Sequence, residues 1–199
     1  MGYAVIHLAP QPEWQDWIRE ELQMLDLDPL MWNYEEVYPK CRRTLALMVH
    51  LGHPLPIPLS IRHRSMKTVI PTSSHPMQVM VCQLSMHLDP AIWGADASEF
   101  RPSRCIDTSG ELFVPPKGSY LPWSSGPRIC PGLKMSQVKF VAVMAAIFRS
   151  ARCEPLPTAG IEKPEALRRR LRRLTRDSVS KLTLQLRNAG DVKLQWTAV

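Results

Sequence analysis

The most informative stretch of this chain reads Leu121-Pro122-Trp123-Ser124-Ser125-Gly126-Pro127-Arg128-Ile129-Cys130-Pro131-Gly132. Pro131 suits the first position of a helix, so Cys130 lies immediately before a predicted helix N-terminus. The free N–H groups and the dipole at such a terminus favour a thiolate. Arg128 adds a positive charge, or a fork of donors that could clamp a carboxylate. A thiolate in these surroundings is suited to ligating iron.

The spacing within this stretch is specific. Gly126 and Gly132 permit the backbone to approach something flat or bulky. Together the chemically distinctive positions form an aromatic-x-x-Gly-x-Arg-x-Cys-x-Gly pattern, made by Trp123, Gly126, Arg128, Cys130 and Gly132. A helical pattern over residues 133–148 follows it, and the second half of that segment is apolar all round, which predicts a helix buried on every side.

The other cysteines have an ordinary interpretation. A cysteine without special neighbours is usually a small buried hydrophobe, and we expect this of Cys41, Cys82, Cys105 and Cys153. Five cysteines in 199 residues are also too few, and odd in number, for a secreted disulfide framework.

The loop pattern resembles the haem-ligand loop of the cytochrome P450 family, with Trp123 in the place usually held by phenylalanine. Residues 87–97 and 100–104 are similar to the meander region of that family. Residues 3–22 resemble the end of its long central helix and the helix that follows. The segment 186–196 is similar to the C-terminal strands of fungal members. The resemblance therefore extends over nearly the whole chain.

The resemblance implies a haem-dependent monooxygenase with Cys130 as the axial thiolate ligand of the iron. It implies that Arg128 binds a haem propionate, that Trp123 packs beside the sulfur, and that Gly126 and Gly132 shape the loop. The implied substrate is an apolar small molecule, oxidised in fungal secondary-metabolite biosynthesis with electrons from an NADPH-dependent reductase. The family also implies the endoplasmic reticulum membrane as the location.

Two departures from the family pattern affect this expectation. The acid–alcohol motif of the oxygen-activating helix would end just before residue 1, so no catalytic residue is identifiable, and we expect a truncated C-terminal portion that lacks the N-terminal half. The Glu-x-x-Arg pair expected near residues 45–51 is also absent. Arg104 occupies the position of the meander arginine that this pair would bind, so Arg104 is expected to lack its partners, which is costly if it is buried.

Periodicity and breakers predict a mainly α fold with small β-sheets (α+β), and the resemblance implies that it is the C-terminal part of the cytochrome P450 fold, lacking the N-terminal half. Apolar residues at helical spacing predict helices over 12–25 and 40–51, and two β-prone runs, 67–70 and 78–82, predict a small sheet. The runs 181–186 and 192–196 flank a turn at 188–191 and predict a hairpin. We expect one incomplete domain over 1–199, with helices in 3–51, a small sheet and meander in 52–120, the cysteine loop in 121–132, a buried helix in 133–150, and a tail and hairpin in 151–199.

Charge and targeting signals narrow the possible partners. The net charge of +7 depends on six arginines between positions 168 and 176, without which it would be +1. Such a run usually forms a solvated helix face; a membrane-surface contact is a second interpretation, and nucleic acid is disfavoured because no binding motif accompanies the block. No signal peptide or membrane-spanning segment is evident, so membrane contact would have no anchor in this sequence.

A second functional hypothesis stays open beside the monooxygenase. A chain without the oxygen-activating motif could be a non-catalytic remnant, or the product of a misread gene, with little or no haem binding. An incomplete cavity cannot exclude water or position oxygen.

Overall fold

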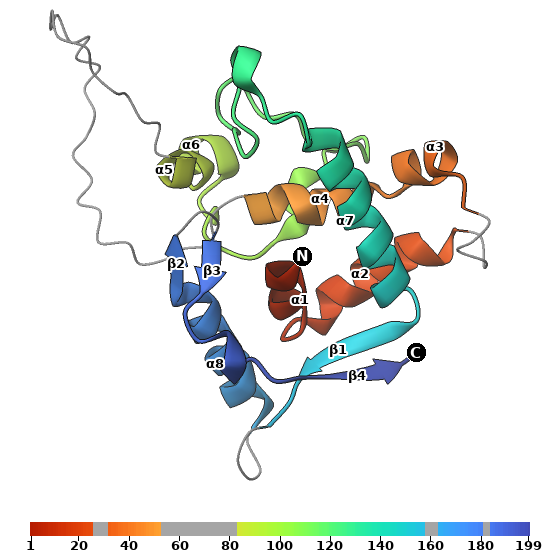
Figure 1. Ribbon diagram of the computed structural model, residues 1–199, viewed down its shortest axis with the longest axis vertical. Coiled ribbons are helices and arrows are strands. Elements are labelled where there is room, and N and C mark those ends of the chain that lie inside the picture. Colours follow the sequence, from red (N-terminus) through yellow and green to blue (C-terminus); the bar gives the residue numbers. More distant parts are fainter. Residues whose placement is uncertain (26–31, 53–82, 158–162, 181–183) are drawn as a thin grey trace, which may run out of the picture.

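The computed structural model of the chain describes residues 1–25, 32–52, 83–157, 163–180 and 184–199 (Figure 1). The described α-helices are α1 (Gly2–Leu8), α2 (Pro12–Gln23), α3 (Tyr34–Val37), α4 (Arg42–Gly52), α5 (Gln83–His87), α6 (Pro90–Trp93), α7 (Leu133–Phe148) and α8 (Pro164–Arg176). The strands are β1 (Ala151–Pro155), β2 (Ser178–Ser180), β3 (Leu184–Leu186) and β4 (Leu194–Ala198). Short 3-10 turns cover Tyr38–Lys40, Pro102–Cys105, Gly126–Arg128 and Ala189–Asp191. The fold is therefore a mixed α+β arrangement dominated by helices, as the sequence predicts.

The helices predicted near the N-terminus are present and form the core. Pro12 starts α2 at a position where no N–H is needed, and Ile18 and Leu22 on its apolar face are fully buried. α1, α2, α4 and α7 pack around one cluster, in which Leu8, Leu47, Met144 and Phe148 are among the most buried side chains. Figure 1 shows α1 near the centre of this arrangement.

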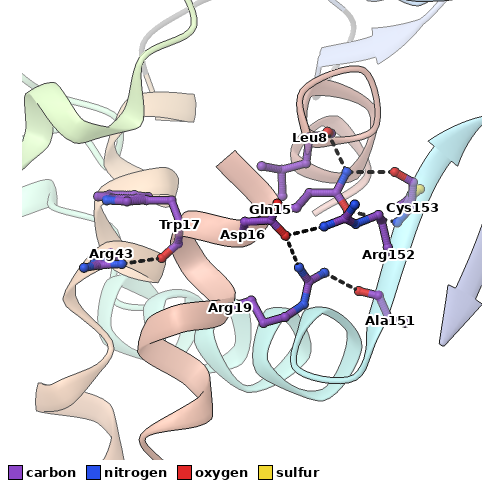
Figure 2. Close-up of polar contacts among 9 residues, drawn as sticks. All are labelled: Leu8, Gln15, Asp16, Trp17, Arg19, Arg43, Ala151, Arg152 and Cys153. Atoms are coloured by element: carbon purple, nitrogen blue, oxygen red, sulfur yellow. Dashed lines mark hydrogen bonds and ion pairs between the residues drawn. The ribbon is translucent and has the colours of Figure 1, made fainter. Parts of the chain in front are cut away.

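A polar contact at the edge of this core joins α2 to β1 (Figure 2). Gln15 is fully buried. Its Nε2 donates to the carbonyls of Leu8, at 2.9 Å, and Cys153, at 2.7 Å, and its Oε1 accepts the amide of Cys153 at 2.9 Å. The side-chain amide thus pairs with both backbone groups of Cys153, as a neighbouring strand would. Beside it, Asp16 forms ion pairs with Arg19 and Arg152.

The predicted hairpin between the runs 181–186 and 192–196 is wrong, because the two strands pair with other elements. β4 pairs antiparallel with β1, so that Cys153 faces Trp196, and β3 pairs antiparallel with β2. The ladder of β1 and β4 is extended by hydrogen bonds from Leu156 N to the Lys193 carbonyl and from Val199 N to the Ser150 carbonyl. The segment between β3 and β4 is bound to the end of α8. There the Arg187 amide donates to the Asp177 carbonyl and the Arg187 Nε donates to the Asp177 Oδ1, each at 3.0 Å.

The burial of α7 also differs from the prediction. Phe140, Met144 and Phe148 are buried against the core. Ala142 and Ala146, however, are exposed, and Met135 is 71% exposed. α4, α2 and β1 contact this helix from the buried side. The turn that follows α3 also contacts it, because the Tyr38 hydroxyl donates to the Gln137 Oε1 at 2.9 Å and the Lys134 amine lies over the Tyr38 ring. The apolar run is therefore not buried on every side, since Met135, Ala142 and Ala146 remain exposed.

Two further predictions concern the middle of the chain. The sheet predicted from the runs 67–70 and 78–82 lies outside the described residues. Between residues 88 and 127 the structure is largely irregular, as predicted. It contains α6, the two turns Pro102–Cys105 and Gly126–Arg128, and one isolated bridge between Ile106 and Leu112. The short helices α3, α5 and α6, and the strands β1 and β2, were not predicted.

Candidate haem-ligand site

Backbone hydrogen bonds close the cysteine loop, residues 121–132, on itself. The Cys130 amide donates to the Trp123 carbonyl at 2.9 Å, and the Ile129 amide donates to the Gly126 carbonyl at 3.1 Å. These bonds bring the start and the end of the loop together before α7. In Figure 1 the loop, drawn in green, extends beyond the N-terminal end of α7.

Trp123 attaches the loop to the first turn of α7. Its Nε1 donates to the Ser136 Oγ at 3.1 Å, and that hydroxyl donates to the Leu133 carbonyl at 2.7 Å. The Trp123 ring also meets the edge of the Tyr120 ring, whose hydroxyl donates to the Val49 carbonyl of α4 at 3.0 Å. The aromatic position of the sequence pattern therefore has a structural partner on each side.

Gly126 is required by its backbone conformation. Its φ is +71°, in the left-handed region that residues with a Cβ rarely adopt. A Cβ placed there would meet no atom within 4 Å. The conformation, and not the space, therefore accounts for glycine at this position. Ser124 shares the left-handed conformation, with φ of 65°.

Cys130 is the exposed cysteine among those that the structure describes. The thiols of Cys41, Cys105 and Cys153 are fully buried, and burial raises the pKa of each to about 12. These three are small packing residues, as predicted, whereas Cys82 lies outside the described residues. Cys130 is a free thiol on the surface of the loop. A metal or an electrophile can therefore reach only this sulfur of the four.

The helix after the loop covers the segment predicted over 133–148, but Pro131 is not its first residue. α7 begins at Leu133 with Gly132 as its N-cap, and Pro131 lies in the preceding turn. The Leu133 amide donates to the Cys130 carbonyl at 3.2 Å, which places the thiol one turn before the helix and not directly on its first residue.

The five predicted site residues share this loop, although not all of them touch. Trp123 and Cys130 are joined by the backbone bond, and a Cβ at Gly132 would lie 3.7 Å from the Cys130 Sγ, an ordinary contact distance. Arg128 lies in the 3-10 turn with Gly126. Its side chain is exposed, and no ion pair to another described residue is formed.

Arg104, expected to lack partners, is paired. Its side chain is 4% exposed and forms an ion pair with Asp96 at 2.9 Å. Its guanidinium also donates to three backbone carbonyls, those of Trp93 (2.9 Å), Asp96 (2.7 Å) and Glu99 (3.1 Å). A carboxylate eight residues upstream thus pairs with the buried charge where the Glu-x-x-Arg pair is absent, while the buried Nε of Arg104 has no hydrogen-bond partner among the described residues.

Two histidines have structural roles that the sequence analysis did not assign. His87 is buried, and its Nε2 accepts the Leu121 amide at 2.9 Å, which fixes the first residue of the cysteine loop. His50, also buried, accepts the Arg101 amide at 3.2 Å and so binds α4 to the segment that carries Arg104. A buried histidine has no distinctive sequence pattern, so neither role could be predicted.

Comparison with known proteins identifies the family. The sequence pattern of the cytochrome P450 family matches residues 53–176, more than half of the chain. The chain belongs to the cytochrome P450 family. Among curated relatives, it is 34% identical over 188 residues to the phomenoic acid biosynthesis cluster cytochrome P450 monooxygenase of Leptosphaeria maculans, covering 78% of this chain and 32% of that protein.

Relatives in animals match at similar levels. A cytochrome P450 of Caenorhabditis elegans is 32% identical over 159 residues, covering 75% of this chain and 29% of that protein. Cytochrome P450 4F2 of Homo sapiens is 26% identical over 178 residues, covering 85% of this chain and 33% of that protein. The chain thus spans about a third of the length of these cytochromes P450.

The family implies a haem cofactor, and the residues of the loop fit one. An exposed free thiol, an exposed guanidinium two residues away and two glycines are compatible with an iron porphyrin that carries anionic propionates. Within the described part of the chain, no group of three His, Cys, Asp or Glu side chains could hold a metal ion on its own. No helix in that part is long and apolar enough to cross a membrane.

Proposed function

We propose that this cytochrome P450 chain supplies the haem-binding loop of a monooxygenase, in which the Cys130 thiolate would hold the iron. The observation that carries the proposal is the contrast between one exposed, free thiol in a closed loop and three buried thiols with raised pKa values. A thiolate ligand must be accessible and deprotonated, and only Cys130 among the described cysteines is accessible.

The residues of the loop would have separate roles. Cys130 would donate its sulfur electron pair to the iron, and Arg128 would pair with a propionate. Trp123, held by the Ser136 hydroxyl, would pack beside the sulfur, and Gly126 and Gly132 would keep the backbone close to the macrocycle. When bound, the haem supplies the activation of dioxygen. The chain's own contribution is to hold and orient it.

The substrate class is inferred from the relatives. We infer an apolar small molecule as substrate, and a role in fungal secondary metabolism is supported by the Leptosphaeria relative, whose name places it in a biosynthesis cluster. Electrons would come from an NADPH-dependent reductase, and the endoplasmic reticulum membrane is the proposed location by family resemblance.

Carbon monoxide spectroscopy tests the proposal. The 199-residue chain is loaded with haem, reduced and exposed to carbon monoxide, and the Soret band is recorded. Thiolate ligation shifts this band to the red, and we expect the shift in the wild type and its loss in Cys130→Ser. Because Cys130 is exposed, the free energy of unfolding of the serine variant should lie within about 0.5 kcal/mol of the wild-type value.

A second loop variant distinguishes loss of the thiol from a general disturbance of the loop. Ile129→Ser also changes an exposed position of the loop but retains the thiol, so its red-shifted band should persist. A wild-type chain that folds by circular dichroism but takes up no haem would favour the non-catalytic remnant instead. A red-shifted band that persists in Cys130→Ser would contradict the proposal, because another cysteine would then supply the thiolate.

A further inference from the structure

A cavity of about 430 Å³ lies between α1, the segment 98–100 and α8, on elements other than the cysteine loop and α7. α1 and α8 contact one another, and the Tyr3 and Ser178 hydroxyls are hydrogen-bonded at 2.8 Å beyond the end of α8. The cavity is lined by polar and aromatic side chains, namely His7, Gln11, Ser98, Glu99, Phe100, Arg172, Thr175 and Arg176. Its volume is in the range of sites for small organic ligands.

The lining carries an excess of positive charge. Arg172 and Arg176 are one helical turn apart on α8, where like charges repel. Both are exposed, and neither forms an ion pair with a described residue. Glu99 is the one carboxylate of the lining, so the two arginines outnumber it. Another face of α8 is held by the buried side chains of Leu167 and Leu171, of which Leu171 belongs to the core cluster.

The inner part of the lining contains a histidine with an unused nitrogen. His7 is 6% exposed, and its Nε2 has no hydrogen-bond partner among the residues that the structure describes. Burial, assisted by the charge of Arg172, lowers the pKa of His7 to about 4, so the ring is neutral at pH 7. The ring stacks on Phe100, with 5.2 Å between the centroids. A buried polar nitrogen without a partner is rare and costs free energy, and an anion would satisfy it together with the arginines.

We propose that this cavity binds a phosphate group, held by Arg172 and Arg176 with His7 beneath it, and that the organic part of the ligand rests against Phe100. Guanidinium groups bind phosphate through paired, charge-assisted hydrogen bonds, which matches two arginines on one face of a helix. The phosphate could be carried by a soluble phosphate ester or by a lipid headgroup, and both present the same chemistry to the arginines.

Binding measurements on the 199-residue chain test the proposal in two arms. Calorimetry with phenyl phosphate examines a soluble ester, with chloride at equal ionic strength as the blank. Sedimentation with phosphatidylcholine vesicles that contain phosphatidic acid examines a headgroup. The test variant is Arg172→Gln with Arg176→Gln. The control variant, Arg169→Gln with Arg173→Gln, removes the same charge from exposed positions of α8 that do not line the cavity.

The two double variants distinguish binding in the cavity from general attraction to the basic face of α8. We expect the test variant to weaken binding about tenfold or more in at least one arm, since each bidentate contact is worth about that factor. The control variant should change it by about twofold or less. The arm in which this difference occurs identifies the carrier of the phosphate. In addition, ¹H–¹⁵N NMR should show that the ligand shifts the His7 ring resonances in the wild type.

Two results would overturn the proposal. One is equal weakening by the test and control variants, which would indicate attraction to the basic face of α8 as a whole. The other is the absence of binding in both arms to a chain that is folded by circular dichroism. All four substituted arginines are exposed, so loss of the fold is not expected to obscure either result.

Discussion

The contact between Gln15 and β1 and the cysteine loop use polar groups in opposite ways. At the first, a buried side-chain amide makes three hydrogen bonds, and the neighbouring carboxylate of Asp16 pairs with two arginines (Figure 2). At the second, the thiol of Cys130 and the guanidinium of Arg128 are exposed, and the bonds that hold the loop are made by its backbone and by Trp123. The first region stabilises the chain, and the second presents groups to a ligand.

This difference separates stability from ligand binding. A residue whose bonding groups are all used inside the protein cannot be replaced without leaving partners unsatisfied. A residue that is held only by its backbone can be replaced at small cost to folding. Substitutions at Gln15 should therefore lower the free energy of unfolding more than substitutions in the cysteine loop.

The largest effect is expected for Gln15→Ala. The variant leaves the amide and the carbonyl of Cys153 without partners in a buried position. Each such group costs about 1–3 kcal/mol, so we expect a loss of about 4 kcal/mol in the free energy of unfolding, measured with urea. Gln195→Ala is the control, because Gln195 is exposed and makes one 3.4 Å bond to Glu154. Similar midpoints for the two variants would contradict the role assigned to Gln15.

A smaller effect is expected from pH, through His7. The pKa of His7 is lowered by burial to about 4 in the folded chain, against an ordinary value near 6.5. Between these values the unfolded chain binds the proton and the folded chain does not, so stability is lost as the pH falls. We expect the wild type to lose about 3 kcal/mol more than His7→Phe between pH 6.5 and pH 4.

Urea unfolding across this pH range measures the difference. His7→Phe keeps an aromatic ring against Phe100 while removing the titrating group, and carboxylates titrate equally in both proteins. Parallel stability curves for the two proteins would show that His7 is not held neutral by the fold.

The smallest of these effects is expected in the cysteine loop, for Gly126→Ala. The φ of +71° becomes strained when a Cβ is present, although no atom blocks it, and the expected loss is about 1 kcal/mol. If the loop presents Cys130 to haem, haem affinity should fall by more than the loss of stability explains, because the strain displaces the turn that ends at Arg128. Equilibrium unfolding and haem titration on the same variant compare the two. An unchanged haem affinity would contradict this role of Gly126.

The helices could be predicted from sequence because their signals are local. Apolar residues at helical spacing predicted the helix over 12–25 that became α2, and the arginine run was expected to form a helix face, which α8 provides. Strand pairing depends on distant partners. The β-prone runs indicated β3 and β4, but nothing within 181–196 shows that β4 prefers β1, where Trp196 packs against Phe148.

The candidate site was predictable only at its centre. The spacing around Cys130 identified the loop, and the exposure of this thiol agrees with that interpretation. The groups that hold the loop in place, His87 and Ser136, come from outside it or from the next helix, and a single polar residue there has no distinctive pattern. Likewise, Asp96 gave no sign that it would pair with Arg104.

The pairing of β1 with β4 bears on how the chain is made. Ala151 has Ala198 as its ladder partner, and Pro155 has Leu194. On the ribosome, β1 therefore emerges well before the strand that completes it, and its outer edge has no ladder partner until then. The other edge can already bind Gln15, which emerged earlier. The side-chain amide of α2 is thus placed to hold β1 during synthesis, when an unpaired strand is most exposed to aggregation.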